Sequence, residues 1–150
     1  MNELGLSLQP FLSEGPVPGI KINCGITRTA NIIAVSYELH GSEEIIIPAP
    51  SDVPLRKKDL WNETCLELFL GVKDSPRYWE FNLSPSGHWN VFRFDTYRQG
   101  MQEEMSFVSL PFTIENKSDS LALHLKFDPG KIVRTAQPLE ASVSAVIKQR

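Results

Sequence analysis

The chain has 150 residues, of which 41% are hydrophobic and 22% are charged, and its formal net charge is −3. This length and composition suit one globular domain with its own core, so we expect a single domain over residues 1–150. The negative charge argues against nucleic acid and anionic membranes as partners, and no stretch has the roughly 18 apolar residues that span a bilayer.

Apolar and polar residues alternate with a period of two along most of the chain, which is typical of half-buried β-strands. The predicted strands are, in chain order, residues 20–26, 31–39, 45–47, 64–72, 78–83, 89–94, 107–114, 120–127 and 139–148. Pro85 and Gly87 predict a turn that joins 78–83 and 89–94 into a hairpin. Only residues 51–61 and 96–105 could form short helical turns. This pattern predicts an all-β fold, an antiparallel two-sheet β-sandwich.

The N-terminus and the cysteines indicate the compartment. Glu3 stands where a secretory leader carries positive charge, so we expect no leader and a cytoplasmic protein. Cys24 and Cys65 match neither a disulfide framework nor a zinc site. They are predicted to be reduced thiols, with Cys65 buried in a strand, and we expect no metal site and no cofactor.

The segment 60–101 carries the residues that point to a function. If Leu66, Leu68 and Leu70 face the core, the residues between them face the other side of the sheet. The same phase in the next two strands gathers polar and aromatic side chains on one face. Aromatic rings stack on the apolar face of a pyranose, and carboxylates and amides bond its hydroxyls. The predicted ligand-binding residues are Trp61, Glu67, Tyr78, Glu80, Asn82, Trp89, Arg93 and Arg98.

Two sequence blocks carry a resemblance to a known family. The first consists of Trp61, Thr64, Cys65, Glu67 and Phe69, and the second runs from Tyr78 to Trp89 and includes Ser-Pro-Ser-Gly. These blocks resemble a bacterial group within the DOMON-like superfamily, which is related to the family 9 carbohydrate-binding modules. The resemblance implies a sandwich of the jelly-roll type and a sugar or haem ligand. The function of that group is unassigned.

The chain departs from the resemblance at its end. Relatives continue past the strand equivalent to 139–148 into an aromatic segment, whereas this sequence stops at Arg150. The departure implies that one aromatic of a sugar clamp is missing. An unpaired edge strand left by this difference could pair two chains into a homodimer.

Several alternatives remain open beside a non-catalytic carbohydrate-binding module. Glu67 and Glu80 could instead form a structural network with Arg93 or Arg98, or could act as a glycosidase pair. The exposed sheet face could bind another protein. A haem module would need axial ligands, for which the candidates are His88, His124, Met101 and Met105.

Overall fold

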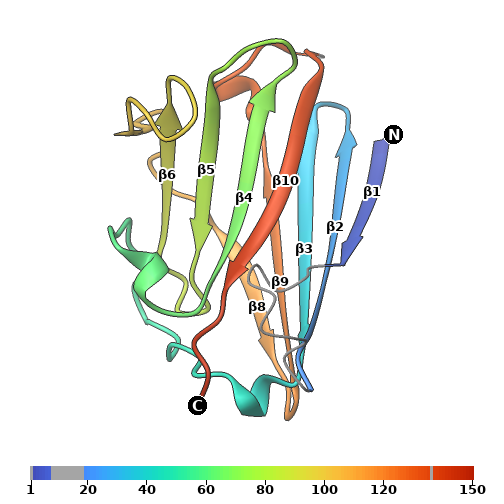
Figure 1. The fold of residues 1–150 in the computed structure, drawn as a ribbon, viewed down its shortest axis with the longest axis vertical. Coiled ribbons are helices and arrows are strands. Elements are labelled where there is room, and N and C mark those ends of the chain that lie inside the picture. The colour runs from blue at the N-terminus through green and yellow to red at the C-terminus, as the bar shows by residue number, and fades with distance from the viewer. Residues whose placement is uncertain (1, 8–18, 136) are drawn as a thin grey trace.

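The chain folds into two antiparallel five-stranded sheets that face each other as a sandwich (Figure 1). The computed structural model describes residues 2–7, 19–135 and 137–150. The first sheet has the order β1-β2-β3-β9-β8, and the second has the order β10-β4-β5-β6-β7. The strands are β1 (Asn2–Ser7), β2 (Lys21–Thr29), β3 (Ile32–His40), β4 (Cys65–Val72), β5 (Tyr78–Leu83), β6 (Trp89–Phe94), β7 (Gln102–Glu103), β8 (Phe112–Asn116), β9 (Ser120–Phe127) and β10 (Leu139–Val146).

The predicted all-β antiparallel sandwich is confirmed, and so is the hairpin between β5 and β6. The helical regions are 3₁₀ turns at Ser42–Glu44 (η1), Leu60–Asn62 (η2) and Pro129–Lys131 (η3). Of the two stretches expected to form helical turns, 51–61 therefore contains only the start of η2. Residues 96–105 instead contain a tight turn and the short strand β7.

Two predicted strands are wrong in position. Residues 45–47 form no strand, because the chain turns in η1 and leaves a single bridge between Ile45 and Gln149. The strand predicted over 107–114 begins only at Phe112, directly after Pro111, which has no N–H to donate to a ladder. Strand β1 was not predicted.

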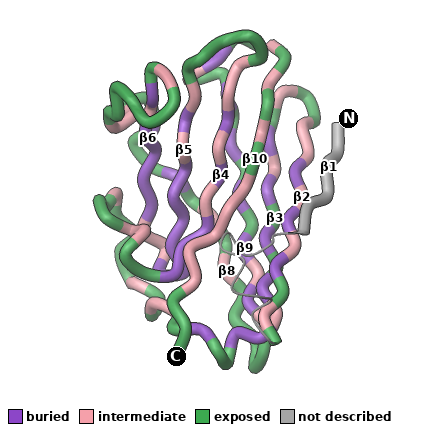
Figure 2. Tube along the Cα trace, in the orientation of Figure 1, coloured by how far each residue is buried: buried purple, intermediate pink, exposed green. Residues whose placement is uncertain are grey.

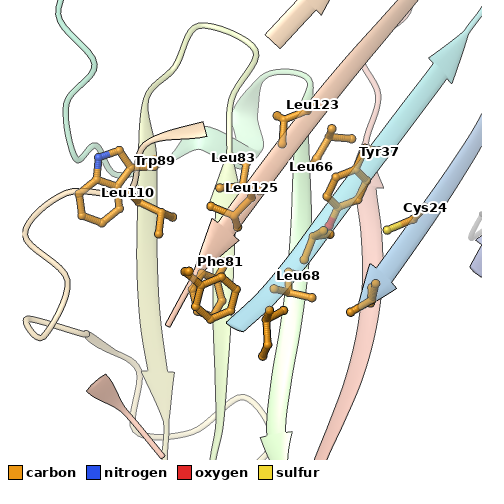
Figure 3. Packing of buried hydrophobic residues seen from close by; sticks show 14 of the residues in the cluster. Cys24, Tyr37, Leu66, Leu68, Phe81, Leu83, Trp89, Leu110, Leu123 and Leu125 are labelled. Atoms are coloured by element: carbon orange, nitrogen blue, oxygen red, sulfur yellow. The ribbon is translucent and has the colours of Figure 1, made fainter. Parts of the chain in front are cut away.

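The core lies between the two sheets and is built by the alternation of each strand (Figure 3). Phe81 of β5 is fully buried, and its ring lies 4.7 Å from that of Phe127 and 5.6 Å from that of Phe107. Tyr37 of β3 crosses the core and donates a hydrogen bond of 2.5 Å to the carbonyl oxygen of Glu67 in β4. Apolar contacts and this hydrogen bond therefore tie the strand that carries the candidate site to the opposite sheet.

Burial differs across the second sheet (Figure 2). Strand β5 lies at its centre, and all but two of its residues are buried. Strand β10 is half-buried or exposed along its length and, among the strands that the structure describes, pairs only with β4. Pairing of two chains along such an edge stays a prediction. Within the described ranges, no helix is long and apolar enough to cross a membrane.

The substitution Phe81→Ala tests the core between the sheets. Removing a fully buried ring that contacts two aromatic neighbours should lower the free energy of unfolding by about 3–5 kcal/mol. Urea denaturation followed by tryptophan fluorescence measures this change. Val108→Ala is the control, because the Val108 side chain is 87% exposed and its loss should change stability by less than about 0.5 kcal/mol. Equal effects of the two substitutions would contradict this description of the core.

Candidate ligand-binding face

The candidate site occupies the face of the second sheet that points away from the core, here called the outer face. Antiparallel pairing aligns its side chains in rows across the strands. One row consists of Ser144, Glu67, Asn82 and Asn90, the next of Ser142, Phe69, Glu80 and Phe92, and a third contains Tyr78 and Phe94. The predicted sharing of one face by Glu67, Tyr78, Glu80 and Asn82 is confirmed.

Asn82 joins two carboxylates at the middle of the outer face. Its side chain is fully buried. With the amide nitrogen turned toward the carboxylates, Asn82 donates to Glu80 Oε2 at 3.1 Å and to Glu67 Oε2 at 3.2 Å. The other oxygen of Glu67 accepts a hydrogen bond of 2.6 Å from the hydroxyl of Ser144 on β10. The three residues Glu67, Asn82 and Glu80, called the carboxylate–amide cluster below, therefore leave carboxylate oxygens as acceptors on this face.

The carboxylate–amide cluster has no positively charged partner among the described residues. Among the residues that the structure describes, neither Glu67 nor Glu80 forms an ion pair. Burial and the charge of Glu67 raise the pKa of Glu80 to about 7, although the hydrogen bond from Asn82 opposes the shift. The interpretation that these carboxylates pair with Arg93 or Arg98 is wrong. Arg93 donates to Gln102 at 2.9 Å, and the Arg98 guanidinium lies 5.1 Å from the ring centre of Tyr97.

Aromatic side chains form a hollow next to this cluster. The hollow has a volume of about 380 Å³ and is lined by Phe69, Leu70, Gly71, Tyr78, Tyr97, Glu140, Ala141 and Ser142. The ring of Tyr78 is held by Phe94, on which it stacks at 4.7 Å with an interplanar angle of 6°. The Tyr78 hydroxyl accepts a hydrogen bond of 3.1 Å from the backbone N–H of Arg98. The hollow thus combines aromatic rings with the carboxylate of Glu140 and the hydroxyl of Ser142.

Trp61 lies in η2 and approaches the outer face from the side of β6. Its ring centre is 5.9 Å from that of Phe92, which belongs to the row of Glu80. The structure therefore brings six of the eight predicted site residues to the outer face or its margin. They are Trp61, Glu67, Tyr78, Glu80, Asn82 and Arg98.

The prediction that Trp89 and Arg93 share this face is wrong. Trp89 pairs with Leu83, and Arg93 pairs with Trp79, so both point to the side of the sheet that faces the core. Trp89 is only 4% exposed, and the guanidinium of Arg56 lies 4.6 Å from its ring centre. A ring covered in this way is closed to a sugar.

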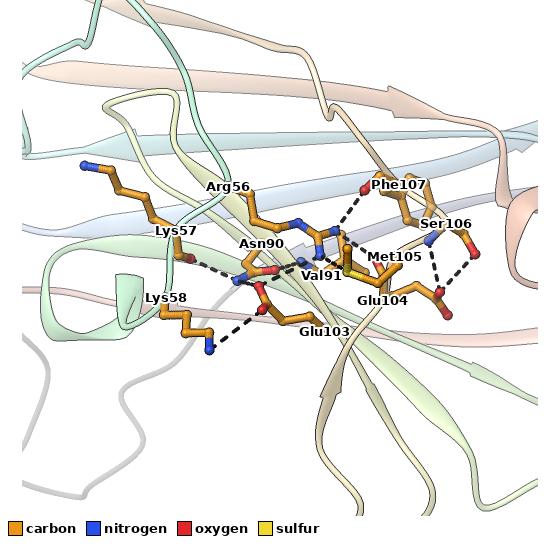
Figure 4. Close-up of polar contacts among 10 residues, drawn as sticks. All are labelled: Arg56, Lys57, Lys58, Asn90, Val91, Glu103, Glu104, Met105, Ser106 and Phe107. Atoms are coloured by element: carbon orange, nitrogen blue, oxygen red, sulfur yellow. Dashed lines mark hydrogen bonds and ion pairs between the residues drawn. The ribbon is translucent and has the colours of Figure 1, made fainter.

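Arg56 belongs to a polar network that fixes the loops beside β6 (Figure 4). It donates to the carbonyl oxygens of Glu104 at 2.7 Å and Phe107 at 2.9 Å. Asn90 is fully buried and donates to Lys57 O at 3.0 Å and to Glu103 Oε2 at 2.9 Å. These polar groups are engaged with one another, which indicates a structural role in anchoring residues 56–58 and 103–107.

Of the residues that line the hollow, the sequence predicted only Tyr78, and four of the others carry an aromatic ring or a polar group. Phe69 follows Glu67 by two positions, so alternation alone places it on the same face. Glu140 and Ser142 lie on β10, far along the chain, and only strand pairing brings them here. Tyr97 is 70% exposed in a loop whose conformation no periodicity indicates.

Both histidines considered as haem ligands have their Nδ1 atoms engaged in other contacts. The Nδ1 atom of His88 accepts a hydrogen bond from the Leu55 N–H, and His124 Nδ1 lies 3.0 Å from Ser36 Oγ on the first sheet. Met101 and Met105 are exposed on the loops that flank β7. Within residues 2–7, 19–135 and 137–150, no group of three or more His, Cys, Asp or Glu side chains could hold a metal ion.

Both cysteines are free and buried, as predicted for Cys65. Burial, together with the charges of Glu67 and Glu80, raises the pKa of the Cys65 thiol to about 12. Cys65 therefore remains a neutral thiol at physiological pH and is no nucleophile for chemistry on this face.

Comparison with known proteins shows the fold and no family. No family model matches the chain, and no curated protein matches it. Among solved structures, it is similar to a candidate carbohydrate-binding protein from Bacteroides uniformis. The two share 9% sequence identity with a TM-score of 0.63, over 86% of this chain and 70% of the other.

The pKa of Glu80 predicts how stability depends on pH. Because the folded pKa, about 7, exceeds the ordinary value of 4.5, the folded state binds more protons between these values. The free energy of unfolding should therefore fall as pH rises from about 4.5 to 7 and change little from this source above 7. Glu80→Gln should remove this fall, which amounts to about 1 kcal/mol after allowance for solvent screening.

Urea unfolding at pH 5, 6, 7 and 8 measures how the free energy of unfolding differs between the wild type and Glu80→Gln. Glu115→Gln is the matched control, because Glu115 is exposed on β8 of the other sheet. Its pH profile should run parallel to that of the wild type. Parallel profiles for wild type and Glu80→Gln would show that Glu80 does not titrate in this range.

Proposed function

We propose that the chain is a non-catalytic carbohydrate-binding module and that its ligand occupies the outer face of the second sheet. The observation that carries the proposal is the hollow lined by Phe69, Tyr78 and Tyr97 beside the carboxylate–amide cluster. Its volume of about 380 Å³ falls within the range of roughly 300–1,000 Å³ that small-molecule sites occupy.

The chemistry of the hollow matches a sugar ring. Tyr97 and Tyr78 offer flat apolar surfaces for the C–H face of a pyranose, and Ser142 and Glu140 can bond its hydroxyls. Glu80 and Phe69 face each other across adjacent strands, so the carboxylate–amide cluster begins one strand from the hollow. Carboxylates with no cationic partner retain acceptor capacity for hydroxyl groups. The similarity in fold to a candidate carbohydrate-binding protein supports the same assignment.

The geometry of Glu67 and Glu80 favours binding over hydrolysis. A glycosidase holds its two carboxyl groups on either side of the scissile bond, with the sugar between them. Here one amide nitrogen of Asn82 lies within hydrogen-bond distance of both carboxylates. Both carboxylates project from the same sheet face and share this amide donor, an arrangement suited to bonding the hydroxyls of a ligand that lies on that face.

A protein partner is the second candidate. The loops on either side of β7 expose Met101, Met105 and Val108, the last of which is 87% exposed. Exposed apolar side chains that follow one another along a loop are a feature of protein-binding surfaces. This candidate predicts that no sugar stabilises the fold.

Thermal unfolding against a panel of mono- and oligosaccharides, including cell-wall fragments, tests the proposed function. A sugar at 100 times its dissociation constant should stabilise the protein by about 2.7 kcal/mol, which raises Tm by several degrees. Tyr97→Ala should weaken binding of that sugar about fivefold or more, because it removes an exposed stacking surface. It should leave Tm without sugar almost unchanged, since Tyr97 is 70% exposed.

Val108→Ala is the matched control, because it removes an exposed apolar side chain outside the hollow. It should bind the sugar as the wild type does. If no sugar in the panel raises Tm at tens of millimolar, roughly the weak limit of specific binding, a protein partner becomes the better assignment. A shift that survives Tyr97→Ala would place the sugar elsewhere on the molecule.

A further inference from the structure

A second, larger hollow lies apart from the outer face, at the end of the sandwich where the turn between β4 and β5 meets the connection between β9 and β10. Its volume is about 840 Å³. Its walls come from Ser75, Pro76 and Arg77, from residues 130–135, and from Trp79 and Asp95. None of the described residues lines both hollows.

Positive charge gathers around this hollow. Arg77, Lys131 and Arg134 line it, and all three residues are exposed. Arg28 stands directly behind it, because its guanidinium donates a hydrogen bond of 2.5 Å to the carbonyl oxygen of Gln137, another lining residue. The whole chain carries a net charge of −3, so this cluster of cations is a positively charged region on a protein that is negative overall.

The carboxylates of the described residues form no ion pair with these cations. Within the described part of the chain, no ion pair involves Arg28, Arg77, Lys131 or Arg134. The partners of Arg28 are neutral, since its second hydrogen bond, of 2.7 Å, goes to the side-chain oxygen of Asn31. The ammonium of Lys131 lies 5.4 Å from the ring centre of Phe107.

Among the described residues of the lining, Asp95 alone is acidic, and it is turned toward its own loop. A Cβ atom added at Gly100 would lie 2.2 Å from Asp95 Oδ2. The carboxylate therefore rests against the backbone of Gly100. One carboxylate held in this way leaves the walls of the hollow with an excess of positive charge.

From this arrangement we propose that the hollow binds a small anion that carries carboxylate or phosphate groups. A concave surface lined by charges of one sign focuses the field and attracts ions of the opposite sign. Guanidinium groups bind carboxylate and phosphate with paired N–H donors, and two of the lining cations are arginines. Arg28 is preorganised by its two hydrogen bonds and adds positive potential from behind the wall.

Isothermal titration at constant ionic strength tests this inference with citrate and inorganic phosphate as probes, and with chloride as the reference salt. We expect saturable binding of citrate, of phosphate, or of both. The probe that binds more tightly identifies the preferred class of anion. The double variant Arg77→Gln/Arg134→Gln should weaken that binding at least tenfold, because it removes both guanidinium groups that can donate charged hydrogen bonds to the anion.

Lys21→Gln/Lys126→Gln is the charge-matched control, since Lys21 of β2 and Lys126 of β9 are exposed on the other sheet. This control should bind the anion as the wild type does. The inference is overturned if neither probe binds the wild type, or if both double variants weaken binding equally. Sugar binding at the outer face does not enter this test, so each proposal can fail while the other stands.

Discussion

The organisation of the molecule depends on the two-residue alternation of β4. Leu66, Leu68 and Leu70 are each no more than 2% exposed, and they fix this strand against the opposite sheet. A shift of one residue would exchange the two faces and bury Glu67 in the core, at a cost far above the stability of a single domain. The hydrophobic core therefore determines that Glu67 and Phe69 point outward, and strand pairing then places Asn82 and Glu80 beside them.

Alternation allowed the sequence to assign the two faces of β4 and β5 correctly, whereas for β6 it predicted the bounds of the strand but not which face points to the core. In β5, apolar and polar residues separate cleanly, with Phe81 inside and Glu80 outside. In β6, both faces are apolar, because Val91 faces the core and Phe92 lies under Trp61 on the outer face. A strand that is hydrophobic on both faces has no phase that periodicity can reveal.

The rest of the candidate site depends on contacts between distant parts of the chain. Ser142 reaches Phe69 only because β10 pairs with β4, and no local pattern at either residue specifies that partner. The hollow at the end of the sandwich has the same origin, since Arg28 comes from β2 whereas Arg77 and Arg134 come from two separate connections. Local sequence patterns therefore predicted the sandwich and the carboxylate–amide cluster, whereas tertiary structure created both hollows.

The loop that carries Tyr97 has a consequence for how this fold can diversify. Its ends are closed by hydrogen bonds of 3.0 Å from Asp95 N to Gln99 O and from Gln99 N to Thr96 O. Because the loop completes its own turn and buries no core residue, substitutions at its tip should change the free energy of folding very little. The carboxylate–amide cluster, by contrast, is embedded in paired strands. During divergence, substitutions at the rim of the hollow can therefore alter the preferred ligand at little cost in stability, whereas substitutions in the carboxylate–amide cluster one strand away also disturb the sheet.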